Sequence, residues 1–170
     1  ILLDQLADIA ANQRRAQCEQ AARHFGLASL RDLDLSTLLA HGDELDPVVF
    51  RRARHVLSEN QRVLHARDAL VANDLARLGQ WMAASHASMR DDFEITVPAI
   101  DQLVAILQSS IDSHGGARMT GGGFGGCVVA LLPLERVAAA RAAVDAHYRS
   151  PTGLPALMYL CRASAGARVL

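Results

Sequence analysis

Residues 115–132 mark a change in the character of the chain: Gly-Gly-Ala-Arg-Met-Thr-Gly-Gly-Gly-Phe-Gly-Gly-Cys-Val-Val-Ala-Leu-Leu. The last part of this stretch, Cys127–Leu132, is apolar and contains β-branched residues, which predicts a buried strand. The first part, Gly115–Gly126, contains seven of the twelve glycines in the chain, and Ala117–Thr120 within it is a short extended segment. The stretch therefore predicts two strands joined by a glycine-rich loop.

Helical patterns fill the chain before this stretch and return after it. Apolar residues recur at helical spacing, and Asp46 followed by Pro47 pairs an N-cap with a proline in the first turn. We expect helices over 2–25, 36–40, 47–73, 74–88, 98–114 and 134–148, and a further strand over 157–161. This order predicts an α+β fold, in which a helical block is followed by a small antiparallel sheet with helices packed on one face. We expect one domain over residues 1–170, or two tightly fused subdomains.

The composition excludes several classes of function. All 17 basic residues among the 170 are arginine, which rules out a Walker-loop lysine, a Schiff-base lysine and a lysine-bound pyridoxal cofactor. A net charge of −1 and an aromatic content of 4% argue against nucleic acid as a partner. The three cysteines are far apart, which favours a reducing, cytoplasmic compartment over a zinc site or a disulfide framework. No apolar run reaches the roughly 20 residues that a membrane span needs, so we expect no membrane partner.

The density of glycines in residues 115–126 has two competing explanations. One is a tight turn that needs left-handed backbone. The other, which we favour because a hairpin needs only one or two glycines, is close approach of bare backbone to a ligand or another loop. In an extended segment Arg118 and Thr120 share one face and Met119 takes the other. Arg118 either binds a phosphate or carboxylate ligand, or pairs with a carboxylate of this chain.

A second cluster, Ser85–Glu94, gathers a histidine, two serines, an arginine and three carboxylates. A Ser/His/Asp hydrolase is one hypothesis, but no Gly-x-Ser-x-Gly elbow presents a serine, and we favour helix capping and loop-fixing hydrogen bonds. His55 and Glu59 are one helical turn apart on what we interpret as a solvated or partly buried face, and we expect no metal site there. We interpret six arginines as solvated helix faces because acidic residues are interleaved with them: residues 14, 15, 23, 51, 52 and 54.

Four segments, in one order, resemble the C-terminal half of the galactokinase family within the GHMP superfamily of small-molecule kinases. They are Asn12–Glu19, Phe50–Leu57, Ser85–Pro98 and Gly116–Cys127. The resemblance implies a ferredoxin-like, GHMP kinase C-terminal fold, and phosphoryl transfer from MgATP to the anomeric hydroxyl of galactose. It also implies support of the phosphate-binding loop and the sugar pocket by the last segment, through Arg118, Met119, Thr120, Gly121, Gly122, Gly123, Phe124, Gly125 and Gly126.

The sequence departs from the family in ways that bear on activity. The galactose-recognition motif and the ATP loop of the family's N-terminal half do not occur in these residues, and the family's catalytic aspartate and arginine belong to that half. No residue here inherits a catalytic role. By this resemblance, Ala11 stands before Asn12 where the family has a tyrosine, a change that would remove a hydrogen bond to galactose. We therefore expect the chain alone to be inactive, with ATP and Mg as cofactors only when an N-terminal half is supplied. Galactose and ATP are partners by resemblance, and we expect their binding to this chain to be weak or absent.

An alternative is a stand-alone, non-catalytic module derived from the kinase fold. Such a module would bind or sense a ligand, or it would form homo-oligomers through the face that meets the N-terminal half in the family. Residues 1–11 do not resemble the family and look helical, so under this hypothesis they would form a replacement cover for that face.

Overall fold

The structure is a computed structural model that describes the backbone of residues 2–162 and the side chains of residues 8–162. It is mostly helical, with one two-stranded sheet. The principal elements, in chain order, are α1 (Leu2–His24), α2 (Leu35–Ala40), α3 (Pro47–Val71), α4 (Leu75–Asp91), α5 (Pro98–Ile111), β1 (Gly116–Thr120), β2 (Cys127–Leu131) and α6 (Val137–His147). Short 3₁₀ turns cover Leu30–Asp32, Gly42–Glu44, Asp112–His114 and Leu134–Arg136.

Side-chain caps explain where the two longest central helices begin. The carboxylate of Asp46 accepts hydrogen bonds from the backbone N–H groups of Val48 and Val49, at 2.8 and 3.2 Å, and Pro47 occupies the first turn of α3. The carboxylate of Asp74 likewise accepts from the N–H of Arg77 at 2.9 Å and caps α4. These bonds satisfy donors that have no partner within the helix, and the predicted starts of both helices are confirmed.

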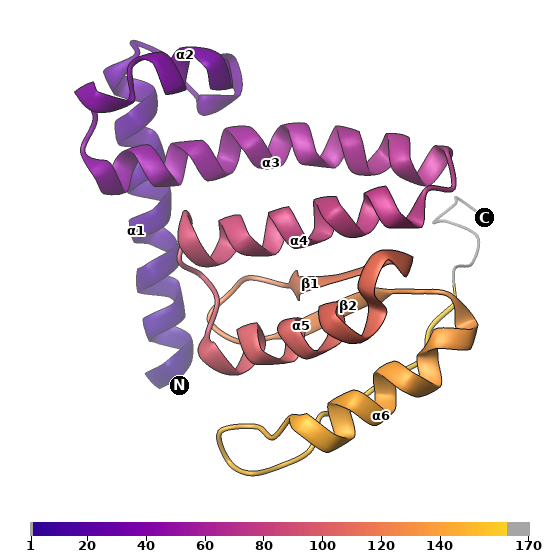
Figure 1. The fold of residues 1–170 in the computed structure, drawn as a ribbon. Helices are drawn as coiled ribbons and strands as arrows, with labels where there is room; N and C mark the ends of the chain where they lie inside the picture. The colour runs from indigo at the N-terminus through magenta and orange to yellow at the C-terminus, as the bar shows by residue number, and fades with distance from the viewer. Residues whose placement is uncertain (1, 163–170) are drawn as a thin grey trace, which may run out of the picture.

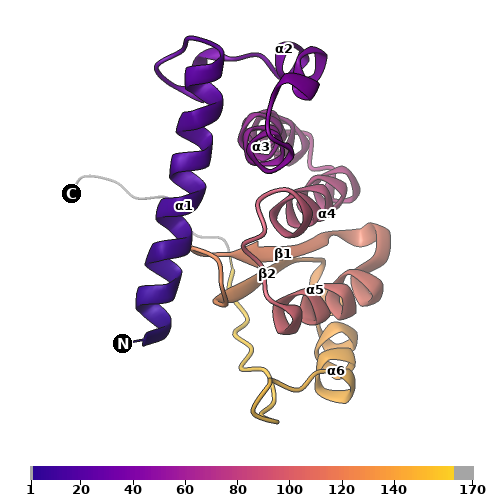
Figure 2. The same ribbon diagram turned by 90° about the vertical axis from the view of Figure 1, so that its left-hand side faces the viewer.

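The helices stack in successive layers across the molecule (Figure 1). α3 and α4 lie antiparallel, the sheet and α5 follow, and α6 forms the opposite side, while α1 crosses the end of the stack. Figure 2 shows α1 upright beside the ends of the other elements. The larger buried core joins α1, α2 and α3 through Ala21, Ala22, Leu30, Leu33, Leu38, Leu45, Val49, Ala53 and Leu57. A smaller core lies against the sheet and consists of Met89, Ile100, Val104 and Met119. No helix among the described residues is long and apolar enough to cross a membrane.

The sheet is an antiparallel hairpin with one covered face. Met119 pairs with Val128 and Arg118 pairs with Val129 in the β1–β2 register. The Met119 side chain is fully buried against α4 and α5, whereas Val129 on the other face is 46% exposed. Side chains alternate between the faces of a strand, so among the described residues α4 and α5 pack against the Met119 face, and the opposite face is partly exposed. This confirms the α+β prediction, with Arg118 and Thr120 on the face opposite to Met119.

The outer edge of β1 is covered by α4 and α5. Gly79 of α4 approaches so closely that a Cβ atom there would lie 1.7 Å from the carbonyl oxygen of Gly115. The Gln108 side chain of α5 donates to the carbonyl of Ala117 at 3.0 Å, and the N–H of Met119 donates to the side chain of His86 at 3.3 Å. The Ala117 carbonyl and the Met119 N–H at this edge, which could otherwise pair with another strand, are therefore bonded to side chains.

The predicted strand over 157–161 is wrong. Residues 154–162 have no strand assignment, and Leu157 and Tyr159 are 79% and 78% exposed. An apolar sequence becomes a strand only when its backbone pairs with a neighbouring strand, and among the described residues this segment has no such partner.

The predicted end of α4 at Ser88 is three residues short. The helix continues to Asp91 and carries most of the Ser85–Glu94 cluster. Residues 163–170 lie outside the described residues.

Candidate functional site

The turn between β1 and β2, Gly121–Gly126, is called the glycine loop below. Its backbone has left-handed φ values of 104°, 92°, 137° and 92° at four glycines, 121, 123, 125 and 126, and 58° at Phe124. Left-handed backbone is accessible to glycine at no steric cost and is costly for most other residues. The turn explanation therefore accounts for four of the glycines, while Gly122 needs a separate explanation.

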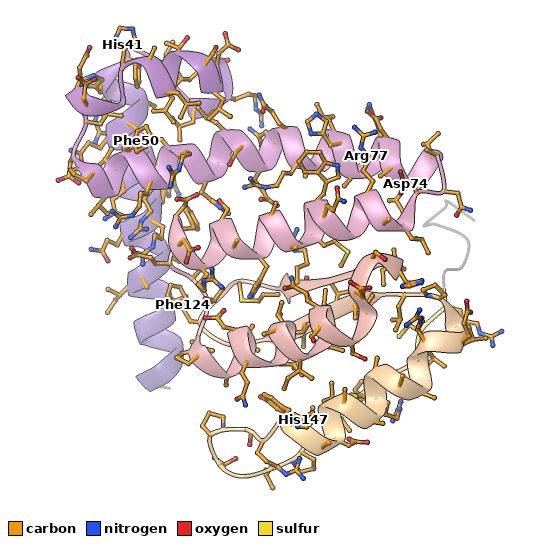
Figure 3. All side chains as sticks on the ribbon, in the orientation of Figure 1. His41, Phe50, Asp74, Arg77, Phe124 and His147 are labelled. Carbon is orange, nitrogen blue, oxygen red and sulfur yellow. The ribbon has the colours of Figure 1, made fainter. Side chains whose placement is uncertain are left out.

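One anchor ties the glycine loop to the linker between α4 and α5, residues 92–97. The backbone N–H of Phe124 donates to the carbonyl of Ile95, with an N···O distance of 2.6 Å. A Cβ atom at Gly123 would lie 2.8 Å from the Cβ of Ile95 and 2.9 Å from its carbonyl oxygen, so this contact requires glycine. Figure 3 labels Phe124 at the end of the molecule where α4 gives way to α5. The linker therefore determines where the tip of the glycine loop lies.

The rest of the glycine loop faces open space. A Cβ atom built at Gly121, Gly122 or Gly125 meets no described atom within 4 Å. Within the part of the chain that the structure describes, Phe124 is the only loop residue whose N–H donates a hydrogen bond. Gly122 has no left-handed φ and no close neighbour, so nothing described in this chain requires glycine there. The loop presents bare backbone donors suited to an anion or to close packing against another backbone.

Arg52 binds the linker, and its burial shows that the prediction of a solvated helix face is wrong for this residue. Its residue exposure is only 2%. Its guanidinium donates to the Gln17 side chain at 3.1 Å, to the carbonyl of Asp92, and to the Glu94 carboxylate at 2.7 Å. These acceptors come from α1 and the linker, so one side chain of α3 joins three segments. The hydrogen bond from Arg52 is the largest cause of the lowered pKa of Glu94.

Arg14 of α1 holds the same linker from a second side, and it is also not solvated. Its side chain is 12% exposed and donates to the carbonyls of Phe93 and Glu94 at 2.6 and 3.1 Å. Arg51, which is more exposed, completes the group with a 2.9 Å bond to the Glu94 carboxylate. Glu94 itself has a left-handed φ of 53°, which a non-glycine residue adopts only when its surroundings hold it there.

Arg118 pairs with a carboxylate of this chain. Its guanidinium lies 3.4 Å from Glu59 of α3 and also donates to its neighbour's carbonyl, that of Met119, at 3.0 Å. Glu59 further accepts hydrogen bonds from Ser85 at 2.5 Å and from Arg62 at 2.8 Å. Burial alone would raise the pKa of Glu59, but these hydrogen bonds and the charges of Arg62 and Arg118 outweigh it and lower the pKa. Arg118 therefore links β1 to α3 through an ionised carboxylate.

The serine, histidine and aspartate of the second cluster meet, but not as a hydrolase triad. The Ser88 hydroxyl donates to the Asp92 carboxylate at 3.0 Å, and His55 Nδ1 lies 2.9 Å from the same hydroxyl oxygen. The serine thus stands between the histidine and the aspartate, and it gives its proton to the carboxylate rather than to the base. His55 is buried, stacks on Phe93, and has a pKa lowered mainly by burial. This arrangement fixes the linker, as the loop-fixing interpretation expected.

Comparison with known proteins assigns this chain to a family. The family described as GHMP kinases C terminal matches residues 66–150, which is half of the chain. This chain belongs to the GHMP kinases. In three dimensions it is similar to a galactokinase of Lactococcus lactis in complex with galactose, with a TM-score of 0.78 and 37% sequence identity. The match covers 86% of this chain and 39% of that galactokinase, so the chain spans about two fifths of the length of its relative.

The predicted site residues of this GHMP kinase chain lie in one continuous segment of the fold. Residues 118–126 form the end of β1 and the glycine loop, and their role toward a substrate or phosphate stays a prediction. The other three segments that resemble galactokinases converge on the linker, because Arg14 and Arg52 each donate hydrogen bonds to the Ser85–Pro98 segment. Sequence reasoning missed Arg14 and Arg52, although their place in matched segments was a signal. Among the described residues, no three histidine, cysteine, aspartate or glutamate side chains gather to hold a metal.

Proposed function

We propose that this chain forms the C-terminal half of a galactokinase-like enzyme that transfers a phosphoryl group from MgATP to the anomeric hydroxyl of galactose. The observation that carries the proposal is the open face of the glycine loop. Gly122 needs no left-handed backbone and meets no described neighbour, so a reason for glycine there has to come from outside the described chain. A nucleotide phosphate, a sugar or the backbone of a phosphate-binding loop would each use such a bare surface.

In this proposal the chain contributes shape rather than catalytic groups. Phosphoryl transfer depends mainly on positioning and on neutralising charge around the transferred group. The Arg118 charge is already paired with Glu59. The glycine loop would therefore act by letting the other half approach closely, and MgATP would be held mostly by that half. The chain alone is expected to show no turnover.

Complementation tests this function. The chain is fused to the part of the Lactococcus lactis galactokinase that it does not match, and ADP release is followed with galactose and MgATP. We expect turnover from the fusion and none from either part alone. Gly122→Val, which adds a side chain on the open face, is expected to lower kcat/KM at least tenfold while the circular dichroism and melting of the isolated chain stay unchanged. Turnover by the chain alone, or full activity of the Gly122→Val fusion, would overturn the proposal.

A second candidate, an oligomerising module, is supported by the uncovered face of the sheet. Val129 and Leu131 are 46% and 38% exposed on that face, and Leu134 nearby in sequence is 60% exposed. Light scattering across a range of concentrations tests this role: the module predicts a dimer that Val129→Asp dissociates. A monomer at all concentrations would exclude it. For either role we propose the cytoplasm, because Cys18, Cys127 and Cys161 are all free thiols.

A further inference from the structure

Beside the glycine loop lies a group of polar side chains that is buried at His86 and partly buried at Asp101 and Thr96. His86 of α4 is 4% exposed. Its Nδ1 accepts a hydrogen bond from the backbone N–H of Met119 at 3.3 Å, and its Nε2 lies 3.2 Å from Oδ1 of Asp101 in α5. The other carboxylate oxygen of Asp101 accepts from the Thr96 hydroxyl of the linker at 3.1 Å. Four segments of the fold, β1, α4, α5 and the linker, are therefore joined through the side chains of His86, Asp101 and Thr96.

The donor at Met119 determines where the imidazole carries its proton. A backbone N–H can only donate, so Nδ1 of His86 must be the unprotonated nitrogen of a neutral ring. The hydrogen then sits on Nε2 and faces Asp101, an arrangement in which a carboxylate orients a histidine. Burial is the largest cause of the lowered pKa of His86, which favours the neutral ring. Nε2 and Oδ1 are shielded from solvent and have no other polar partner in the described chain, although they are not aligned as a full hydrogen bond.

This group of polar side chains reaches both anchors of the glycine loop. Met119 is two residues before Gly121, so its bond to His86 fixes the strand that enters the loop. Ile95 holds the loop tip through the N–H of Phe124, and it is adjacent to Thr96, which donates to Asp101. The entrance and the tip of the loop are thus held by groups that meet at Asp101.

We infer that His86 and Asp101 are positioning residues for the glycine loop, holding its entrance and its tip at one fixed separation so that its open face is preorganised. This inference deepens the proposed function and rests on it for its relevance to catalysis. The alternative is that Asp101 only provides a polar partner for the buried His86 side chain, and that the pair contributes only to global stability. The two differ in how far a local change travels. If the pair positions the loop, a change at His86 or Asp101 alters the hydrogen-exchange rate of the Phe124 amide. If the pair contributes only to global stability, the same change alters the exchange rates of all amides together, or that of Met119 alone.

Matched variants separate these roles. In His86→Asn the side-chain amide oxygen takes the place of Nδ1 and keeps an acceptor for Met119, whereas His86→Leu keeps the volume and removes the acceptor. Asp101→Asn keeps the shape of the side chain and removes its charge. Asp91→Asn is the control, because Asp91 is an exposed carboxylate whose salt bridge among the described residues is with Arg90 next to it.

The measurement is amide hydrogen exchange by NMR on the chain itself, with ¹⁵N spectra of the histidine rings. We expect the proton of His86 on Nε2. We expect His86→Leu to speed exchange at both Met119 and Phe124 by about tenfold relative to Leu57 in the other core, since a buried N–H loses its partner. His86→Asn should restore Met119, and Asp101→Asn should speed exchange at Phe124. A proton on Nδ1, or unchanged exchange at Phe124 in both His86→Leu and Asp101→Asn, would overturn the inference.

The same variants in the fused enzyme connect the pair to catalysis. With the loop face misplaced, we expect kcat to fall about tenfold in His86→Leu with less than a twofold change in the KM for galactose, and to recover in His86→Asn. Unchanged kcat in His86→Leu would overturn the catalytic relevance of the pair. Because the exchange experiment needs no turnover, a fusion without activity would count against the proposed function and would leave the positioning result standing.

Discussion

Replacing Arg52 by alanine removes a charged side chain that joins α1, α3 and the linker. Arg52 is 2% exposed and bonds to Gln17, to the carbonyl of Asp92 and to the carboxylate of Glu94. Water cannot take the place of the guanidinium in so buried a position without rearrangement. The substitution therefore leaves a buried carbonyl and a side-chain amide without the donor that Arg52 supplies, and removes one of the counter-charges of the partly exposed Glu94 carboxylate.

The size of the loss follows from these three contacts. Breaking a buried ion pair by removing one partner costs about 3–5 kcal/mol. Glu94 is 45% exposed and can be rehydrated, so the lower end applies, and we expect Arg52→Ala to reduce the free energy of unfolding by about 3 kcal/mol. Arg52→Lys should lose roughly half as much, because one ammonium group cannot reach acceptors on two elements with the geometry of a planar guanidinium.

Urea denaturation followed by circular dichroism measures this loss, and Arg51→Ala provides the matched control. Arg51 is the preceding residue in α3 and bonds to the same Glu94 carboxylate, but its side chain is 33% exposed. An exposed pair contributes about 0.5 kcal/mol. Equal losses for Arg51→Ala and Arg52→Ala would refute the reasoning, because burial would then not be what distinguishes the two arginines.

Two further predictions concern backbone packing and pH. Gly79→Ala should destabilise the chain by at least about 3 kcal/mol in the same assay, because overlap of its methyl group with the backbone beside β1 outweighs a gain of about 1 kcal/mol in helix propensity. The control Gly122→Ala should change the free energy of unfolding by less than about 0.5 kcal/mol, because no described atom lies near its Cβ position. Similar losses at both positions would contradict the close approach of α4. Burial lowers the folded-state pKa of His55 and His86 below the ordinary value of 6.5, so the unfolded chain binds protons more readily, and the free energy of unfolding should be highest above that pH and fall as the pH drops through the folded-state values. Urea midpoints that stay constant from pH 7.5 to pH 5 would contradict this.

Local signals in the sequence predicted most of the secondary structure. Asp46-Pro47 and the apolar spacing after it predicted α3, because caps and helical periodicity act within a few residues of one another. The glycine-rich stretch followed by Cys127–Leu131 predicted the hairpin for the same reason. The assignment to galactokinase-like GHMP kinases was also available from the sequence, since it rests on linear segments in a fixed order.

Properties that depend on distant partners could not be obtained in this way. The segment 157–161 has the composition of a strand, but whether it pairs depends on an adjacent ladder, which lies elsewhere in the fold. Arg52 occupies a helix whose charge pattern is that of a solvated surface, and its burial results from α1 and the linker closing over it. The hydrogen bond from Met119 to His86 and the contact of His86 with Asp101 join β1, α4 and α5, which no local pattern connects.

The sequence was therefore sufficient to predict most helices and strands, their order, the family and the place of the glycine loop in the chain, because each of these depends on residues that are close together in the sequence. Folding was required to show which charges are buried, which face of the loop is open and which side chains hold its two ends. These features arise when groups far apart in the chain exclude water together, and desolvation of that kind depends on the whole surrounding structure rather than on any one stretch of it.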